Sequence, residues 1–329
     1  INYCTGADTA TIVEPDPIIT QTAMDAEVGC NGGNDGSASI FAIGGTPPFT
    51  YTWSNAMTGS TITGLSAGWY YVTVEDANHC IHLDSVEITE PTEVVLDLQP
   101  SIFASGDNIS CYHANDGTID LVVSGGVGNY TYMWNTTDTT EDLSGLAAGT
   151  YSVTVQDGNG CVKTASITLT EPTRLVIDSM ISPTFAGGWN ISCYAGTNGA
   201  VNSWSSGGSP GYTYYWSNGD TTQNISGVSA TGSGFFYYLI VTDINGCTAS
   251  DTIQLFEPTQ LTTSVGTQID VSCNGGSNAS VTISASGSTP AYQYQLGSGS
   301  FQSSPTFTGL SAGTYNITVI DANGCSAIQ

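Results

Sequence analysis

The sequence contains very few positively charged residues. Its 329 residues include only two basic side chains, Lys163 and Arg174, against 28 Asp and Glu, which gives a formal net charge of −26. Two cations cannot neutralise a row of phosphates, so nucleic-acid binding is excluded as a function. A basic patch that binds an anionic membrane surface is excluded for the same reason.

Long apolar runs are also missing. The longest, residues 235–241, is far shorter than the ~20 residues that a membrane-spanning helix needs, so no membrane insertion is expected. No secretory leader is visible and the chain begins with Ile1 instead of Met, so we expect a processed product or a fragment. Nine cysteines beside so few Lys and Arg suit an oxidising setting, which predicts an extracellular or cell-surface location.

Turn-forming and apolar residues are both plentiful. The chain has 40 Gly and 12 Pro, and 40% of its residues are hydrophobic. An acidic disordered tail would be far less apolar than this. The composition therefore favours a folded all-β protein with many short strands.

The chain repeats one unit four times. The pattern Tyr-x-Val-x-Val-x-Asp-x-x-x-Cys recurs in variant forms that end at Cys80, Cys161, Cys247 and Cys325. An earlier cysteine recurs at steps of 81, 82 and 80 residues, at positions 30, 111, 193 and 273. We therefore predict an N-terminal strand at 1–15, which is a candidate donor strand, followed by module 1 (16–91), module 2 (92–172), module 3 (173–258) and module 4 (259–329).

Each module is expected to form short strands separated by turns. In module 2, Val153 and Val155 alternate with polar residues, as in a strand with one buried face. Six or seven such strands in roughly eighty residues favour a two-sheet sandwich. The predicted fold is all-β, with four tandem immunoglobulin-like β-sandwich modules in an elongated rod.

An aromatic residue occupies the same place on the third expected strand of every module. That place predicts a buried core role, rather than a platform on which carbohydrate stacks. The predicted core residues are Trp53, Trp134, Trp216 and Tyr294.

These repeats resemble a known family. The motifs Cys-Asn-Gly-Gly-Asn-Asp-Gly (30–36), Gly-Gly-Thr-Pro-Pro-Phe-Thr-Tyr (44–51), Gly-Leu-Ser-Ala-Gly (64–68) and Asp-Ala-Asn-Gly-Cys (321–325) are similar to the SprB-type repeat of large surface adhesins in gliding and biofilm-forming Bacteroidetes. The resemblance covers essentially the whole chain. It implies an extracellular, repetitive adhesin or filament protein whose repeats carry no enzymatic activity.

The two ends of the chain are complementary in sequence. Modules 1 to 3 each end in a strand that leads to Glu-Pro, whereas module 4 stops at Gln329 and lacks this last strand. Residues 4–15 read as that strand, and they end in Glu14-Pro15. We therefore expect copies of the chain to assemble head to tail, with residues 5–15 of one copy completing module 4 of its neighbour. In the alternative, 329 residues are a window of a longer repeat polypeptide that supplies the strand covalently.

The cysteines allow two pairing schemes. Counting two per module favours pairs within modules, Cys30–Cys80, Cys111–Cys161, Cys193–Cys247 and Cys273–Cys325, with Cys4 left over. In an immunoglobulin-like topology, however, these two positions lie at opposite ends of the sandwich, too far apart for a disulfide. Pairs between successive modules, such as Cys30–Cys161, are then the alternative.

Several acidic residues recur in loops and are candidates for calcium binding. They are Asp35, Asp76, Asp116, Asp157, Asp243 and Asp321. Calcium needs six to eight converging oxygens, and no run here has the spacing that supplies them. Ordinary turn chemistry is the favoured interpretation, with no cofactor required and calcium as the candidate ion.

A short Asp-Ser/Thr motif also recurs. By the family resemblance it is similar to the O-glycosylation signal of Bacteroidetes surface proteins, which makes the chain a candidate glycoprotein. The candidate sites are Thr9, Ser85, Thr139, Ser179, Thr221 and Thr252.

The sequence offers no catalytic constellation. The three histidines do not recur between modules, and no serine lies in a nucleophile elbow, so no enzymatic activity is expected. The predicted function is that of a structural subunit of an extracellular filament or surface fibre. The alternative is a glycan- or surface-binding segment of a much longer adhesin, with loops such as 55–60 and 229–234 as candidate glycan contacts.

Overall fold

The structure, a computed structural model, describes residues 6–231 and 234–329. The chain forms two compact units. One comprises Ile1–Ser101 with Thr118–Leu169, and the other comprises Ile102–Gly117 with Thr170–Gln329.

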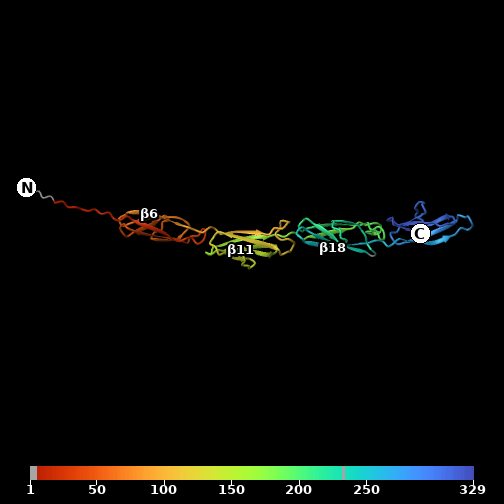
Figure 1. Cartoon of the computed structure of the whole chain (residues 1–329), viewed down its shortest axis with the longest axis horizontal. Helices are drawn as coiled ribbons and strands as arrows, with labels where there is room; N and C mark the ends of the chain where they lie inside the picture. Colours follow the sequence, from red (N-terminus) through yellow and green to blue (C-terminus); the bar gives the residue numbers. More distant parts are fainter. Residues whose placement is uncertain (1–5, 232–233) are drawn as a thin grey trace, which may run out of the picture. The chain divides into compact units, whose positions relative to one another are not determined.

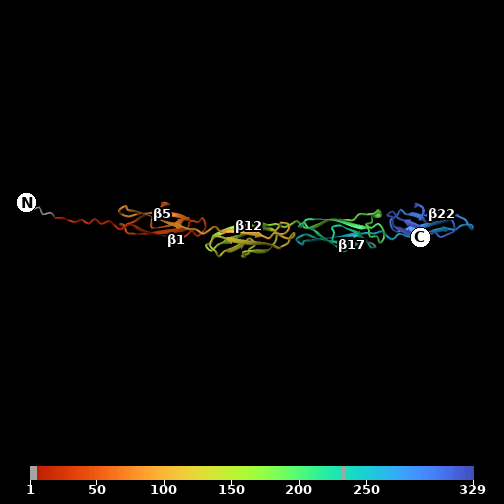
Figure 2. The ribbon, with the colours of Figure 1, turned by 45° about the horizontal axis from the view of Figure 1, so that its top comes forward.

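The first unit contains module 1, a sandwich of two antiparallel three-stranded sheets. One sheet has the order β1-β2-β4 and the other the order β3-β5-β6. Figure 2 shows the two sheets as facing layers, with β1 labelled in one and β5 in the other. The strands are β1 (Ile19–Ala26), β2 (Gly36–Ile43), β3 (Thr50–Trp53), β4 (Thr61–Leu65), β5 (Gly68–Glu75) and β6 (Ile81–Ile88).

The strands of module 2 repeat this arrangement, with sheets ordered β10-β8-β7 and β12-β11-β9. Figure 1 labels β6 of module 1 and β11 of module 2. The module has six strands, in agreement with the six or seven short strands expected from the sequence. They are β7 (Val95–Pro100), β8 (Gly117–Ser124), β9 (Thr131–Trp134), β10 (Leu143–Leu146), β11 (Gly149–Gln156) and β12 (Val162–Leu169).

The second unit contains modules 3 and 4, whose sheets have the same strand order. Among the described residues its only helical element is a short 3₁₀ turn, η1 (Ala186–Gly188), so the predicted all-β class is confirmed. The strands of module 3 are β13 (Val176–Ile181), β14 (Gly199–Ser206), β15 (Thr213–Trp216), β16 (Ile225–Val228), β17 (Phe235–Thr242) and β18 (Thr248–Leu255). Those of module 4 are β19 (Thr262–Ile269), β20 (Ala279–Ser286), β21 (Gln293–Leu296), β22 (Thr306–Leu310), β23 (Ile317–Ile320) and β24 (Ser326–Ile328).

The aromatic residues of the third strands are buried, as predicted. Trp53 and Trp134 are 2% exposed, Trp216 is fully buried and Tyr294 is 7% exposed. Each indole Nε1 donates a hydrogen bond to the carbonyl six residues later, for example from Trp134 to Thr140 at 2.9 Å. A buried donor that is already satisfied in this way stabilises the core and leaves no ring face for a sugar.

In every module a tyrosine hydroxyl forms a hydrogen bond that stabilises the turn before the fifth strand. The Tyr70 hydroxyl donates to the Ser66 carbonyl at 3.1 Å, and the equivalent bonds of the other modules measure 2.9 to 3.0 Å. Just before this turn, Gly64 lies at φ 73°, in the left-handed region that favours glycine.

Candidate functional site: module joints and an open groove

Three disulfides join successive modules. They are Cys30–Cys161, Cys111–Cys247 and Cys193–Cys325, with Cα atoms 5.6 to 5.7 Å apart. In each, the first cysteine of one module bonds to the second cysteine of the next. The predicted pairs within modules, Cys30–Cys80, Cys111–Cys161, Cys193–Cys247 and Cys273–Cys325, are therefore wrong, and the alternative scheme between modules is the one observed.

The geometry of module 1 explains why pairing within a module fails. Cys80 immediately precedes β6, an eight-residue strand that ends at Ile88. The amide of Gly32, two residues after Cys30, binds the carboxylate of Glu90 just beyond that end, at 2.7 Å. Eight residues of strand span roughly 25 Å, whereas a disulfide requires Cα atoms within ~7 Å.

Each joint also contains an asparagine side chain that reaches the preceding module. The Nδ2 group of Asn159 donates to the Gly29 carbonyl at 2.9 Å. Asn245 donates to Ser110 at 3.1 Å, and Asn323 to Ser192 at 3.3 Å. Sequence reasoning missed this role, although an asparagine two residues before the second cysteine of every module was the available signal.

Among the described residues, two cysteines are free and exposed, Cys80 in module 1 and Cys273 in module 4. Both occupy positions that are disulfide-bonded elsewhere in the repeat. Cys80 is equivalent to Cys161, and Cys273 is equivalent to Cys193. Cys4 lies outside the described residues.

The recurring aspartate before each second cysteine organises the joint loop. Asp157 Oδ1 accepts the amides of Asn159 and Cys161 at 3.0 and 2.8 Å, and Oδ2 accepts that of Val127 at 2.9 Å. The Val127 amide, followed by those of Cys161 and Asn159, holds the pKa of Asp157 below its ordinary 3.8, although burial acts to raise it.

Asp76 and Asp321 make the same kind of loop. The Cys80 amide has the largest effect in lowering the pKa of Asp76. Burial raises the pKa of Asp321, but hydrogen bonds from Ser288 Oγ and from the amides of Cys325, Thr289 and Asn323 outweigh it, so the net shift is downward.

Asp243 makes this loop in module 3, where its Oδ1 accepts the amides of Asn245 and Cys247 at 3.0 and 2.9 Å and its Oδ2 accepts that of Ser209 at 2.8 Å. The remaining two calcium candidates have a comparable role at the first cysteine. Asp35 Oδ1 accepts the Gly29 amide at 2.9 Å, and Asp116 Oδ1 accepts the Ser110 amide at 3.1 Å. Within residues 6–231 and 234–329, no cluster of three or more His, Cys, Asp or Glu side chains is arranged to hold a metal ion. The six predicted carboxylates are separate turn anchors here, and calcium binding remains an untested prediction.

The candidate glycosylation sites differ in exposure. Thr9, Thr139, Thr221 and Thr252 are exposed, whereas Ser85 and Ser179 are half-buried in strands. O-glycosylation remains a prediction. Of the candidate glycan-binding loop at 229–234, residues 232 and 233 lie outside the described part.

The histidines lie in separate environments. His79 bonds the Glu75 side chain within module 1, and the His113 ring stacks on Tyr112 at 3.9 Å between centroids. His82 lies on β6. His113 Nε2 also lies 3.9 Å from a carboxylate oxygen of Glu171. The absence of enzymatic activity remains a prediction.

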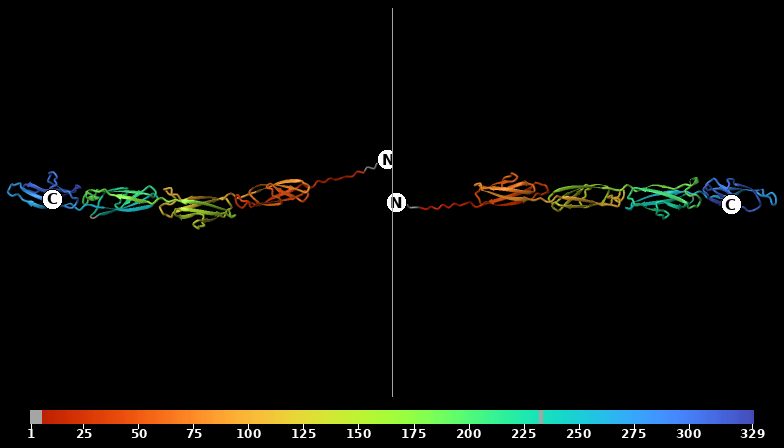
Figure 3. Two further views of the ribbon diagram at one scale, coloured as in Figure 1. Left: turned by 180° about the vertical axis from the view of Figure 1, so that it is seen from behind. Right: turned by 90° about the horizontal axis from the view of Figure 1, so that it is seen from above.

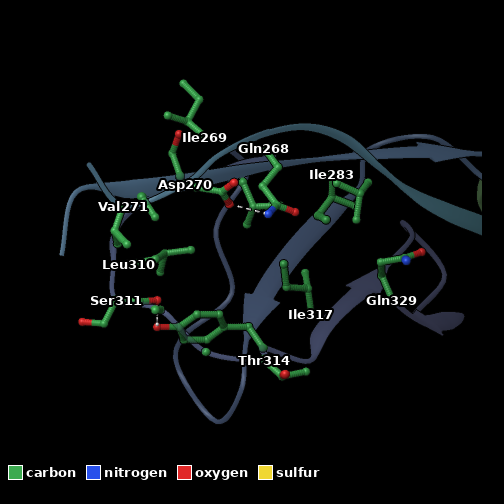
Figure 4. A pocket seen from close by; sticks show the side chains of 17 residues that line it. Gln268, Ile269, Asp270, Val271, Ile283, Leu310, Ser311, Thr314, Ile317 and Gln329 are labelled. Atoms are coloured by element: carbon green, nitrogen blue, oxygen red, sulfur yellow. Dashed lines mark hydrogen bonds between the residues drawn. The ribbon is translucent and has the colours of Figure 1, made fainter. Parts of the chain in front are cut away.

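Module 4 contains an open groove of about 500 Å³ between β19 and β23. Figure 4 shows Ile283, Leu310 and Ile317 around this groove, with Ile269 and Val271 at one end and Gln329 at the other. Residues 313–316, which precede β23, form no strand. The groove therefore combines apolar side chains with a backbone edge that has no strand partner within residues 6–231 and 234–329.

In modules 1 to 3 the same position is filled by the second half of the last strand. In module 1, β5 pairs with β6 along its whole length, from Gly68 with Ile88 to Glu75 with Ile81. In module 4, β23 pairs with only three residues of β24, the first three of the equivalent strand. The side chains that fill the first three modules here are Ile88, Leu169 and Leu255, which are at most 1% exposed.

The residue that faces this strand end differs accordingly. Val28, Ile109 and Ile191 are fully buried, and their amides donate to the carbonyl that follows the last strand at 2.9 to 3.2 Å. The equivalent Val271 is half-buried, and in the described part of the chain its amide has no acceptor.

The described part of the N-terminal segment, residues 6–15, pairs with no sheet. Residues 6–15 have no regular structure and are exposed, with Ile12 at 96% and Val13 at 81%. Both views in Figure 3 show the segment leading away from module 1. Beyond it, the Gly45 amide donates to the Asp16 carbonyl at 2.8 Å, as Gly126 does to Thr92 where the chain enters module 2. The segment thus joins module 1 in the way that a completed last strand joins the next module.

No helix in the described part of the chain has the length and apolar character needed to cross a bilayer.

The fold and the joints define a class: a tandem array of β-sandwich modules linked in series by disulfides. The SprB repeat model matches this chain at residues 26–58, 105–139, 190–221 and 265–301, once in each module. The chain therefore carries four SprB repeats, and the resemblance seen in the sequence is confirmed.

Comparison with solved structures yields tandem-domain proteins of low sequence identity. One is a tetra-tandem repeat in the extending region of a large adhesion protein, 14% identical over 94% of this chain and 97% of that chain, with a TM-score of 0.27. Another is invasin, a bacterial integrin-binding protein, 14% identical over 95% of this chain and 78% of that chain, with a TM-score of 0.35. A search of curated proteins gives no match to this chain.

Proposed function

We propose that this chain is a structural subunit of an extracellular bacterial surface filament that assembles head to tail by donor-strand exchange. Residues 9–14 of one copy fill the groove of module 4 in the next copy. The observation that carries the proposal is the groove itself, which has an apolar lining and an unpaired backbone edge. A strand added there buries the apolar side chains and satisfies the backbone groups together.

The sequence of the N-terminal segment fits the groove in register. Aligned on Glu-Pro, Ile12 takes the position of Ile88, which is 1% exposed in module 1. Ala10 takes the position of Val86, the other inward-facing residue of that strand end. Both side chains of the donor that point inward are apolar, as the alternation of a strand requires.

The flanking polar groups also have partners in this arrangement. In module 1 the Glu90 carboxylate accepts a hydrogen bond from the Gly32 amide. Glu171 and Glu257 accept hydrogen bonds from the equivalent amides of the next two modules, and the three distances are 2.6 to 2.8 Å. Glu14 of the donor takes this role for Gly275, which occupies the same place in module 4. The register stays consistent at the other end, because Gln329 already pairs with Ile317 and aligns with Asp8.

Successive contacts of this head-to-tail kind do not close on themselves, so they generate a fibre. The net charge of −26 keeps separate fibres apart by mutual repulsion. The joint between copies, being partly apolar, forms best when salt screens this repulsion.

The experiment compares purified full-length chain with two variants, Ile12→Asp and Val13→Asp, by sedimentation and negative-stain microscopy in 0.15 M salt. The two variants carry the same added charge, but in the proposed register only position 12, which aligns with the buried Ile88, points into the groove. Val13 takes the place of Thr89, which is exposed. The proposal predicts filaments from the parent and from Val13→Asp, and single subunits from Ile12→Asp.

Filaments from Ile12→Asp, or from a chain lacking residues 1–15, would overturn strand exchange. Absence of filaments from the parent as well would favour the other arrangement, in which a longer polypeptide fills the groove with its own following strand.

A further inference from the structure

Cys80 and Cys273, the free thiols in the part of the chain that the structure describes, each occupy one half of a module joint whose other half is absent. At three joints the first cysteine of one module bonds to the second cysteine of the next. Under this rule Cys273 requires a second cysteine in a module that follows module 4, and Cys80 requires a first cysteine in a module that precedes module 1. Both thiols are exposed.

The Cys80 half of the joint already has the conformation of the bonded joints. Asp76 Oδ1 accepts the amides of Asn78 and Cys80 at 2.8 and 2.9 Å. Asn78 Nδ2 donates a hydrogen bond to Thr46 Oγ1 at 2.8 Å. In a bonded joint, Asn323 Nδ2 donates in the same way to Thr289 Oγ1 at 3.0 Å. The difference is that Asn323 also donates to a carbonyl of the preceding module.

The Cys273 half is preformed as well. The Ser272 amide donates a hydrogen bond to Asn278 Oδ1 at 3.1 Å, and Asn278 Nδ2 donates one to Ser272 Oγ at 2.9 Å. The bonded joint at Cys193 has the same pair, between Ser192 and Asn198, at 3.1 and 2.8 Å. The carbonyl that accepts the joint asparagine there belongs to Ser192, so Ser272 is its counterpart.

We propose that Cys273 of one copy and Cys80 of the next copy form a disulfide, and that Asn78 of the second copy donates to the Ser272 carbonyl of the first. The partner is a second copy of this chain. The proposal rests on the proposed function, because strand exchange brings module 4 of one copy against module 1 of the next. Each joint in the fibre, within and between copies, is then cross-linked in the same way.

The oxidant is a small-molecule disulfide. The Cys273 thiolate attacks it, forms a mixed disulfide and releases one thiolate. The Cys80 thiolate then attacks the Cys273 sulfur, forms the protein disulfide and releases the second thiolate. Two protein thiols are oxidised and one small disulfide is reduced to two thiols, so electrons and protons balance.

The test uses the full chain in a Cys4→Ser background, so that only Cys80 and Cys273 are free. Cys80→Ser and Cys273→Ser variants, distinguished by a mass tag on one of them, are incubated alone and as a 1:1 mixture with oxidised and reduced glutathione. Products are read by intact mass and by non-reducing gels. Peptic peptides locate the bond, because two basic residues give trypsin too few sites.

The parent is expected to form a covalent ladder. The mixture is expected to give no covalent product longer than a dimer, and the heterodimer should be at least tenfold more abundant than either homodimer. Its peptic digest should contain a peptide pair linked through Cys273 and Cys80. Equal homodimers and heterodimers would overturn the proposal, as would filaments that contain no Cys273–Cys80 bond.

The two proposals fail separately. If a variant that carries both Cys80→Ser and Cys273→Ser still forms filaments, the strand-exchange proposal stands, whatever the outcome for the disulfide. A heterodimer that still forms when both partners carry Ile12→Asp would overturn the dependence of the joint on strand exchange.

Discussion

Replacing Ile12 with alanine should weaken the joint between copies by an amount that the structure allows one to work out. Ile12 is 96% exposed in the single chain, whereas its counterparts Ile88 and Leu255 are at most 1% exposed. Docking therefore removes nearly the whole side chain from water, which is worth about 1.5–3 kcal/mol. Truncation to alanine in a packed core costs ~2–5 kcal/mol once the cavity is included.

We take the lower part of that range, about 2–3 kcal/mol, because a groove at the end of a sandwich collapses more readily than a closed core. Since 1.4 kcal/mol is tenfold in an equilibrium constant, the dissociation constant of the head-to-tail contact should rise about 30- to 150-fold. Sedimentation velocity over a dilution series measures this constant from the distribution of oligomer lengths.

Val13→Ala is the matched control. Val13 takes a position that is exposed in the completed modules, so its truncation should change the constant by less than about threefold. Equal shifts for the two variants, or no shift for Ile12→Ala, would refute the assignment of Ile12 to the groove.

Three further outcomes follow from the fold and the joints. Trp134→Ala should destabilise its module by ~3–5 kcal/mol, whereas Trp69→Ala, at a side chain 56% exposed, should cost under ~1 kcal/mol in the same denaturant titration. The pKa values of Asp76, Asp157 and Asp321 are lowered in the folded protein, so these carboxylates contribute their full stability above about pH 5 and lose it as the pH falls below their ordinary 3.8. Melting temperatures should therefore fall in that window. An unchanged melting temperature down to about pH 3 would contradict the loop hydrogen bonds. Peptic mapping of unreduced protein should recover only disulfides between successive modules, and a peptide linking both cysteines of one module would contradict the joints.

The strands could be predicted from the sequence because one face of each is buried. Val153 and Val155 point into the core of module 2 and their polar neighbours point out, so the period of two is visible in the sequence. The aromatic core residues were predictable for a related reason, since the same position recurs in all four modules and only a shared interior requires this.

The disulfide pairing could not be settled from the sequence by counting. Two cysteines per module suggest one bond per module, but the length of β6 separates Cys30 from Cys80 within module 1. Connectivity depends on which loops meet at a joint, and that depends on how modules follow one another. Asn159, Asn245 and Asn323 were overlooked for the same reason, because a loop asparagine resembles ordinary turn chemistry until its acceptor in the preceding module is known.

The groove of module 4 gives the most direct test of head-to-tail assembly. Amide hydrogen exchange is measured on the segment 313–316 in assembled filaments and in single subunits that carry Ile12→Asp. The edge of this segment is unpaired in the single chain, whereas its counterpart in module 1 pairs with β6. Strand exchange predicts that these amides exchange rapidly in the subunit and become as protected in the filament as residues 68–71 of module 1. Filaments in which they still exchange as rapidly as in the single subunit would contradict it.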